Sequence, residues 1–186
     1  KSRLMDLDKI LVRRLRKHGV PVVSFTPSSF MLASGGRIAK ADLKPLKTFL
    51  ELGVVPLLCG DVVPDEEMGF SVISGDQIAI YLAERMNARL VIFGCDVDGV
   101  YSADPKKDPN ATLMEVVTPF TFKKLLQTAG EPASPDVTGG MVGKIRESLR
   151  LVEKGIDVVI MNLTKPQDLA KLMKGKKVSY TRLVLN

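Results

Sequence analysis

A chain of 186 residues with 45% hydrophobic and 26% charged residues is long enough for one globular domain with a substantial core. No apolar run approaches the roughly 20 residues of a membrane-spanning helix, so we expect a cytoplasmic protein whose two cysteines, Cys59 and Cys95, are buried reduced thiols. The net charge of +6 indicates an anionic partner. Because aromatic content is only 5% and tryptophan is absent, a small phosphorylated substrate explains the charge as well as nucleic acid does.

The expected elements alternate between helices and strands. In chain order they are a helix (4–15), a strand (20–25), a helix (42–53), a strand (54–59), a hairpin (62–63 with 70–73), a helix (74–86), a strand (89–95), two helices (120–129 and 139–152), a strand (157–161), a helix (167–173) and a strand (178–185). Apolar strands separated by helices predict an α/β fold with a mainly parallel central sheet and helices on both faces. No internal repeat or linker is visible, so we expect a single domain over 1–186.

Residues 136–144 (DVTGGMVGK) have the layout of a polyphosphate-binding helix start. Gly139 and Gly140 would leave backbone N–H groups bare at the positive end of the helix dipole, and Lys144 adds a charge one turn further on. The P-loop pattern is not met, since Ile145 follows the lysine where that pattern needs serine or threonine. Taken alone, the segment is equally compatible with a glycine-rich helix start and a solvated lysine.

Three further polar clusters follow predicted strands, at the sheet edge where ligands bind in such folds. They are Gly60–Asp61, Ser74–Gln77 and Asp96–Tyr101. Ser74 and Gly75 at a helix start can present a second set of backbone N–H groups. We expect all these segments to face one crevice, and two anion sites there suit a phosphoryl donor and a phosphorylated acceptor.

Each cluster also has a purely structural explanation. Asp76, in a first helical turn, can serve only as a partner of the helix dipole. Asp96 and Asp98 can form a turn with the glycine that follows them, and Tyr101 can be a packing residue. His18 is the only histidine and follows a helix, so no histidine-based catalytic triad lies in the chain. The combination of clusters favours a binding site over these separate explanations.

Three motifs, ISGDQI (73–78), DVDGVYSADP (96–105) and DVTGGMVGK (136–144), occur in this order. They resemble the amino acid kinase superfamily, and within it most closely the isopentenyl phosphate kinases, from residue 1 to about 185. The middle motif is shared with uridylate and glutamate 5-kinases, whereas GDVV (60–63) combined with the other two is more particular. The resemblance implies an αβα sandwich and a homodimer. It also implies an ATP- and Mg²⁺-dependent transferase that converts isopentenyl phosphate to isopentenyl diphosphate in isoprenoid biosynthesis.

The resemblance also implies roles for individual residues. Lys144 would neutralise the transferring phosphoryl group, and Asp76 would orient the catalytic lysines. Ser74 and Gly75 would contact the acceptor phosphate, and the prenyl tail would lie in an apolar pocket near the first helix. The residues expected to bind ATP are Asp96, Asp98, Gly99, Tyr101, Gly139, Gly140 and Lys144.

Two segments of the family pattern have no counterpart in these 186 residues. The family begins with a glycine-rich loop that carries a lysine, followed by a glycine-rich segment whose histidine holds isopentenyl phosphate. We therefore expect the chain to be a fragment or a partial sequence, and the acceptor stays open. Another kinase of the superfamily, acting on fosfomycin, a carboxylate or a nucleotide, is the nearest alternative. A non-catalytic nucleotide- or nucleic-acid-binding domain is the alternative from a different class.

Overall fold

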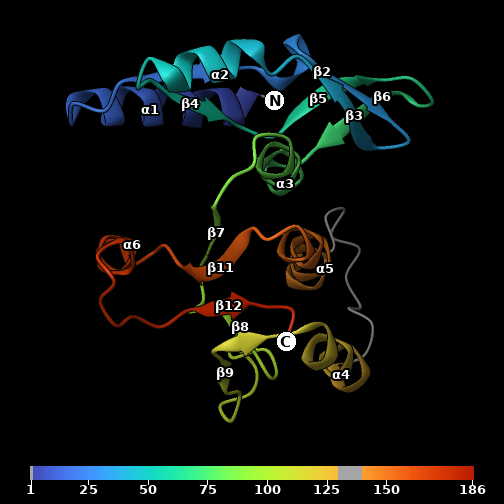
Figure 1. The fold of residues 1–186 in the computed structure, drawn as a ribbon, viewed down its shortest axis with the longest axis vertical. Helices are drawn as coiled ribbons and strands as arrows, with labels where there is room; N and C mark the ends of the chain where they lie inside the picture. The colour runs from blue at the N-terminus through green and yellow to red at the C-terminus, as the bar shows by residue number, and fades with distance from the viewer. Residues whose placement is uncertain (1, 130–139) are drawn as a thin grey trace. The chain divides into compact units, whose positions relative to one another are not determined.

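Figure 1 shows the computed structural model of the chain, which describes residues 2–129 and 140–186. Residue contacts divide the chain into two compact units, residues 1–81 and residues 82–186, called the first and the second unit below. Each unit is described by itself. Within the described ranges, no helix has the length and apolar character needed to cross a membrane.

The first unit combines helices with two small sheets. Its elements are α1 (Ser2–Lys17), β1 (Val22–Phe25), the 3₁₀ turn η1 (Pro27–Ser29), β2 (Met31–Ser34), β3 (Arg37–Ala41), α2 (Lys44–Glu51), β4 (Val55–Leu58), β5 (Asp61–Asp65), β6 (Gly69–Ile73) and the first part of α3 (Gly75–Arg85). Strands β1 and β4 form a parallel pair. The other sheet has the order β3-β2-β5-β6, in which β2–β3 and β5–β6 are antiparallel hairpins. Residues alternate between buried and exposed along β5, as expected for a strand with one face on the core.

One carboxylate holds the turns of these two hairpins together. Gly35 and Gly36 have φ angles of 56° and 79°, which suit the tight turn between β2 and β3. Asp65 is only 5% exposed, and it accepts hydrogen bonds from these two amides at 3.2 and 2.8 Å and from the Ser71 hydroxyl at 2.6 Å. Two amides of its own turn also donate to it. These donors, the Ser71 hydroxyl foremost, hold the pKa of Asp65 well below its usual range.

Replacement of Asp65 by asparagine is expected to lower the melting temperature by several degrees at neutral pH, because an amide cannot accept all of these hydrogen bonds. The folded-state pKa of Asp65 lies below the unfolded value of about 3.9, so its stabilising contribution is present above about pH 4 and is lost at lower pH. The difference in Tm between Asp65→Asn and the wild type should therefore narrow from about pH 4 to pH 2 in scanning calorimetry. Glu66→Gln, in the same turn, is the control and should leave Tm unchanged. A difference that stays constant over this range would contradict the assignment.

The second unit is built around a four-stranded mixed sheet. Its elements after α3 are β7 (Leu90–Cys95), β8 (Val100–Tyr101), β9 (Leu113–Met114), β10 (Val116–Val117), α4 (Pro119–Ala129), α5 (Gly140–Glu153), β11 (Asp157–Asn162), α6 (Pro166–Met173) and β12 (Thr181–Leu183). The strand order is β10-β12-β11-β7, in which β11 runs parallel to β7 and antiparallel to β12. Strands β8 and β9 form a separate antiparallel pair.

Strand β11 is the most deeply buried strand of this sheet. Five of its six residues are buried, which agrees with the unbroken apolar run from Val158 to Met161 and with a strand covered on both faces. Helix α5 buries Ile145 and Leu149 in the same core. In Figure 1, α4 and α5 lie to one side of β11 and β12 and α6 lies to the other. The ends of β7 and β11 are brought together by a register that pairs Cys95 with Asn162.

The α/β fold class is confirmed, and each helix and strand expected from the sequence has a counterpart with bounds shifted by a few residues. The expectation of one mainly parallel sheet is not met in the described residues, which form four separate sheets. Parallel and antiparallel strand pairs are equally frequent in these sheets. The antiparallel pairs are the three hairpins β2–β3, β5–β6 and β8–β9 and the pair of β11 with β12. The β2–β3 hairpin and the short strands β8, β9 and β10 are additions that the sequence pattern did not predict.

The two cysteines are thiols that no disulfide joins, as expected. Both are partly exposed rather than buried, because each lies at or just beyond the end of a strand rather than in its middle. Burial, and then the nearby carboxylate of Asp8, raise the pKa of the Cys59 thiol.

Candidate functional site

The N-terminus of α3 presents backbone N–H groups in the first unit. Ser74 precedes the helix, and its hydroxyl accepts a hydrogen bond from the Gln77 amide at 3.2 Å, which caps the helix as expected. Gly75 is the first residue of the helix and is exposed, and Asp76 lies in the first turn. The first amides of a helix have no partner within the helix, so this end is suited to bind an anion.

Gly60 allows the chain before β5 to pass close to this helix start. A Cβ atom at residue 60 would lie 3.0 Å from the carbonyl oxygen of Ile73 and 3.4 Å from the amide nitrogen of Gly75. The next residue, Asp61, is buried and accepts hydrogen bonds from the amides of Ser28 at 3.0 Å and Val62 at 2.8 Å. Asp61 therefore fixes the start of β5 against η1, and the missing side chain at Gly60 keeps the approach to Gly75 open.

A cavity of about 390 Å³ adjoins the same helix start. Its polar lining comes from Gly60, Asp61, Ser74 and Gly75, and its apolar lining comes from four residues of α1, β5 and β6: Leu4, Val62, Val72 and Ile73. The lining thus combines the helix start at Ser74 and Gly75 with aliphatic side chains. Such a lining is complementary to a molecule with an anionic head and a hydrocarbon tail.

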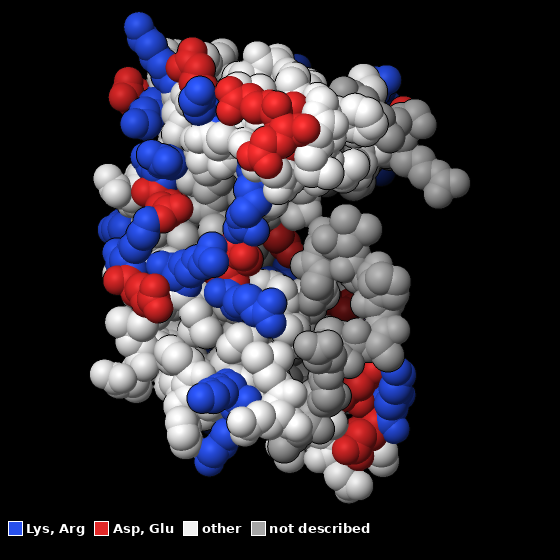
Figure 2. All heavy atoms as spheres, turned by 90° about the vertical axis from the view of Figure 1, so that its right-hand side faces the viewer, with Lys and Arg blue, Asp and Glu red and all other residues white. Residues whose placement is uncertain are grey.

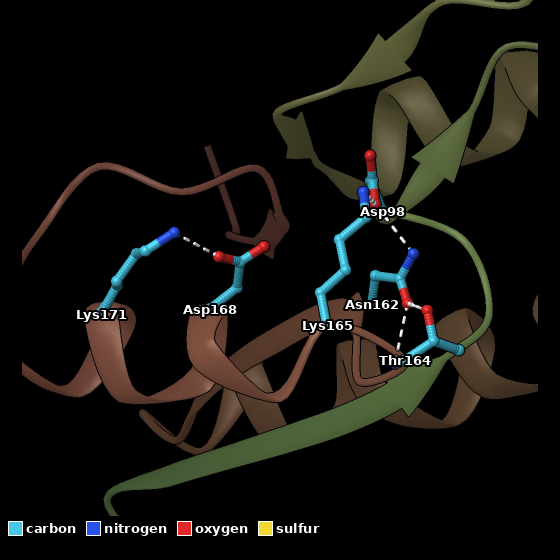
Figure 3. Close-up of polar contacts among 6 residues, drawn as sticks. All are labelled: Asp98, Asn162, Thr164, Lys165, Asp168 and Lys171. Carbon is cyan, nitrogen blue, oxygen red and sulfur yellow. Dashed lines mark hydrogen bonds and ion pairs between the residues drawn. The ribbon is translucent and has the colours of Figure 1, made fainter.

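In the second unit, the segment after β7 carries two aspartates that each bind a lysine. The Lys106 ammonium donates to Asp96 at 2.5 Å and lowers the pKa of that carboxyl. Asp98 accepts hydrogen bonds from the Lys165 ammonium at 2.8 Å and from the Asn162 amide at 2.9 Å, and both donors lower its pKa, Lys165 first. Figure 3 shows Asn162, the last residue of β11, and Lys165, from the segment that follows it, pointing toward Asp98.

Gly99 is required by close packing against β12. A Cβ atom at this position would lie 2.4 Å from Thr181 Oγ1 and 3.0 Å from the Thr181 amide nitrogen. The Thr181 hydroxyl accepts from the Val100 amide and donates to the Met114 carbonyl, both at 2.7 Å, and so joins β12 to the β8–β9 pair. Tyr101 lies in β8 opposite Leu113. The loop that holds Asp96 and Asp98 is therefore fixed at both ends.

Lys144 lies on α5, and its ammonium stands 4.6 Å from the centre of the Phe93 ring on β7. An ammonium over an aromatic face is attracted by the electrons of the ring, so the side chain is directed toward the strand that leads to Asp96. Gly140 begins the helix with a φ of 53° and is exposed. Gly139, the other predicted ATP-binding glycine of this helix start, lies outside the described residues.

The structure thus groups the predicted residues in two sets. Ser74, Gly75 and Asp76 lie together at one helix start of the first unit. In the second unit, the residues from Asp96 to Tyr101 form one loop, and Lys144 packs on the strand before it. That all of them face one crevice stays a prediction.

Sequence reasoning missed three residues of the second set: Lys106, Asn162 and Lys165. All are distant from the aspartates in sequence, by 10, 64 and 67 residues. A signal was present for Asn162, since it is the polar residue at the carboxyl end of an apolar strand, where ligands gather in such sheets.

Several basic side chains of the second unit are paired with acidic ones. In the second unit, Lys106, Lys154, Lys165, Lys171 and Arg182 each form an ion pair with a carboxylate. Figure 2 likewise shows lysine and arginine side chains interspersed with acidic ones on the face that it draws. Proteins that bind a nucleic-acid backbone instead gather unpaired positive charge in one patch or stripe.

Comparison with known proteins gives a match of residues 3–162 to the amino acid kinase family. Isopentenyl phosphate kinase from Methanothermobacter thermautotrophicus is 42% identical over 92% of this chain and 67% of the relative. Isopentenyl phosphate kinase from Arabidopsis thaliana is 32% identical over 84% of this chain and 51% of the relative. A solved structure described as "X-ray structures of isopentenyl phosphate kinase" matches with a TM-score of 0.80 at 40% identity, over 97% of this chain and 66% of that chain.

This chain therefore spans about half to two thirds of the length of these relatives. The family match runs through both units and includes all three motifs at 73–78, 96–105 and 136–144. The chain belongs to the amino acid kinase family.

Proposed function

We propose that this chain is the larger part of an isopentenyl phosphate kinase, which transfers the γ-phosphoryl group of ATP to the phosphate of isopentenyl phosphate and releases ADP and isopentenyl diphosphate. The similarity to isopentenyl phosphate kinases over most of this chain supports the reaction class. The observation that carries the choice of acceptor is the cavity at the start of α3, whose lining combines the first residues of this helix with aliphatic side chains. A prenyl phosphate has this division of charge and hydrocarbon, whereas glutamate and a nucleotide do not.

The chemistry requires charge neutralisation and positioning more than proton transfer. The second pKa of a phosphomonoester is about 6, so the attacking oxygen is already largely ionised at neutral pH. A general base is therefore unnecessary, and the absence of histidine near the motifs is compatible with the reaction. The loose transition state of phosphoryl transfer is stabilised by fixed positive charges and N–H dipoles around the equatorial oxygens.

Each predicted site residue would supply one of these groups. Lys144 would neutralise the γ-phosphoryl group as it moves, and the amides at Gly139 and Gly140 would hold the ATP phosphates. The amide of Gly75 would hold the acceptor phosphate with Ser74 beside it, and Asp76 would orient the catalytic lysines. The nucleoside would lie against the loop of Asp96, Asp98, Gly99 and Tyr101.

Mg²⁺ would bind at this site together with ATP. In the part of the chain that the structure describes, no group of three His, Cys, Asp or Glu side chains could hold a metal ion. Mg²⁺ in kinases is commonly bound through substrate phosphates and few carboxylates, so we propose that it arrives with ATP and neutralises phosphate charge there. A cytoplasmic homodimer is part of the same proposal, and light scattering of the purified protein tests the dimer.

A panel of acceptors tests the proposed function. The full-length protein is incubated with radiolabelled ATP and Mg²⁺ and, separately, with isopentenyl phosphate, glutamate, UMP or fosfomycin. We expect kcat/KM for isopentenyl phosphate to exceed that for each of the others by at least about 100-fold, since the aliphatic side chains that line the cavity offer a polar acceptor no hydrogen-bond partner. Faster turnover of another acceptor would replace this proposal by a different kinase of the family. ATP binding without turnover of any acceptor, or tight salt-dependent binding of an oligonucleotide, would support a non-catalytic domain.

Substitution of Val72 by threonine tests the apolar wall. Val72 lines the cavity and is 68% exposed, so the isosteric threonine should not disturb the fold. A hydroxyl facing the hydrocarbon tail is expected to raise KM for isopentenyl phosphate by about 5- to 20-fold and to leave KM for ATP unchanged. Phe70→Thr is the matched control, because Phe70 is equally exposed on the same strand but does not line the cavity. Equal effects of the two substitutions on the acceptor KM would argue against this wall.

A further inference from the structure

Asn162 is a buried amide at the carboxyl end of β11, and both ends of its side chain are engaged. Its Oδ1 atom accepts from the Thr164 amide at 2.9 Å and from the Thr164 hydroxyl at 2.6 Å. Its Nδ2 atom donates to Asp98 at 2.9 Å, and only 8% of the residue is exposed. In Figure 3 the bonds from Thr164 lie on one side of the amide and the bond to Asp98 lies on the other. These contacts fix the orientation of the amide, so that its donor rather than its acceptor faces Asp98.

The charge of Asp98 makes this orientation significant. A carboxylate accepts hydrogen bonds only, so a neutral donor from Asn162 and a cationic donor from Lys165 both favour its ionised form. Lys165, whose side chain is 47% exposed, lowers the pKa of Asp98 more than Asn162 does, whereas Asn162 supplies the buried contact that orients the carboxylate. The neighbouring Gly99 is held tightly against Thr181, so Asp98 is fixed from two directions.

We propose that Asn162 is a positioning residue for nucleotide binding: it holds the Asp98 carboxylate in place, and through Asp98 it sets the loop from Asp96 to Tyr101 against the nucleoside of ATP. The inference rests on the proposed function insofar as that loop binds the nucleoside. In this role Asn162 acts through Asp98 rather than on a substrate directly. Its contribution therefore belongs to ATP affinity rather than to acceptor binding or to the phosphoryl-transfer step.

Substitution of Asn162 by aspartate isolates the contact with Asp98. Aspartate has the same shape and can still accept both bonds from Thr164, but it presents a second carboxylate to Asp98 in place of the N–H group. Loss of this donor is expected to raise the Kd for ATP, measured by isothermal titration calorimetry, and KM for ATP by at least about tenfold. KM for isopentenyl phosphate should stay unchanged. Lys165→Gln should weaken ATP binding by only about two- to threefold, because the lysine is exposed.

The pH dependence of ATP binding separates positioning from general damage. Two adjacent carboxylates share one proton as the pH falls, and a protonated Asn162→Asp side chain regains a donor toward Asp98. ATP affinity of this variant should therefore recover between about pH 8 and pH 6 by more than that of the wild type. Lys171→Gln is the control for lysine–aspartate pairs, because Lys171 binds Asp168 on α6 at 2.8 Å rather than a carboxylate of the loop, and it should change neither Kd nor its pH dependence.

If Asn162→Asp fails to fold, the exchanged pair Asp98→Asn with Asn162→Asp restores one carboxylate and one amide at this contact. It should recover the melting temperature but not ATP affinity, because the negative charge has moved from the loop. Wild-type ATP affinity in either variant would overturn the inference. Direct titration with ATP needs no acceptor, so it tests the role of Asn162 even if isopentenyl phosphate is not the acceptor. The proposed role of Asn162 and the proposed acceptor can therefore fail separately.

Discussion

Replacement of Lys144 by alanine is expected to lower kcat by about 100- to 1000-fold, because a fixed positive charge beside the transferring phosphoryl group is lost in the transition state. KM for both substrates should change far less, since the charge is most effective when the phosphoryl group is between donor and acceptor. The fold should survive. The ammonium stands over the Phe93 ring at 4.6 Å, and such a contact contributes about 0.5–2 kcal/mol, a small part of the stability of a domain. Single-turnover kinetics and thermal denaturation measure the two effects.

Lys124→Ala is the matched control for this substitution. Lys124 is also a helical lysine over a phenylalanine ring, 4.5 Å from the centre of Phe120, but it lies on α4, outside the three motifs in the sequence. It should leave kcat unchanged. If both variants lost activity equally, or if Lys144→Ala kept wild-type turnover, Lys144 would not be the catalytic lysine.

Replacement of Gly99 by alanine is expected to lower stability by about 2–3 kcal/mol and to raise KM for ATP, because one added carbon cannot be accommodated. The Cβ atom would lie 2.4 Å from the Thr181 hydroxyl oxygen, and the Thr181 backbone blocks a small adjustment at 3.0 Å. Either the loop or β12 must then move, and the bond from the Val100 amide to Thr181 is the first to break. Chemical denaturation measures the loss of stability, and titration with ATP measures the loss of affinity.

Gly155→Ala distinguishes loss of stability from damage to the loop. Gly155 has a φ of 78° and open space around its Cα atom, so alanine there costs about 1 kcal/mol or more in backbone strain without any collision. It should lower Tm but leave KM for ATP unchanged. If Gly155→Ala raised KM for ATP as Gly99→Ala does, the effect would reflect general destabilisation rather than the loop.

The elements that the sequence predicted well are those whose own residues determine them. Strands β7 and β11 are apolar runs that end in polar residues, and Ser74 caps α3 as its position suggests. The β2–β3 hairpin was missed because its strands are short and only partly apolar, although the Gly35–Gly36 pair between them is a recognised turn signal. Which strands share a sheet depends on pairing between distant segments, and local periodicity carries no information about that pairing.

In the candidate site, too, the features set by local sequence were predicted and those set by distant contacts were not. The glycines and aspartates of the three motifs could be selected from the sequence, because helix starts and strand ends have local signatures. Asn162 carried a signal as the polar residue at the end of an apolar strand, but its pairing with Asp98 could not be predicted, since Asn162 and Lys165 meet Asp98 only after β11 has paired with β7. Thr181 is a similar case, because its hydroxyl becomes important only when β12 lies beside the β8–β9 pair.

The position of β12 has a consequence for synthesis on the ribosome. This strand lies between β10 and β11 in the sheet, yet it follows both in the chain, so the sheet of the second unit stays open until residues 181–183 have emerged. No described strand of the first unit pairs with residues 181–183, so its sheets do not depend on them. Domains generally fold in the order in which they are made. During translation the exposed edge of β11 is vulnerable to pairing with other chains. A nascent chain arrested before residue 181 is thus expected to recruit chaperones more strongly than one arrested well beyond residue 183.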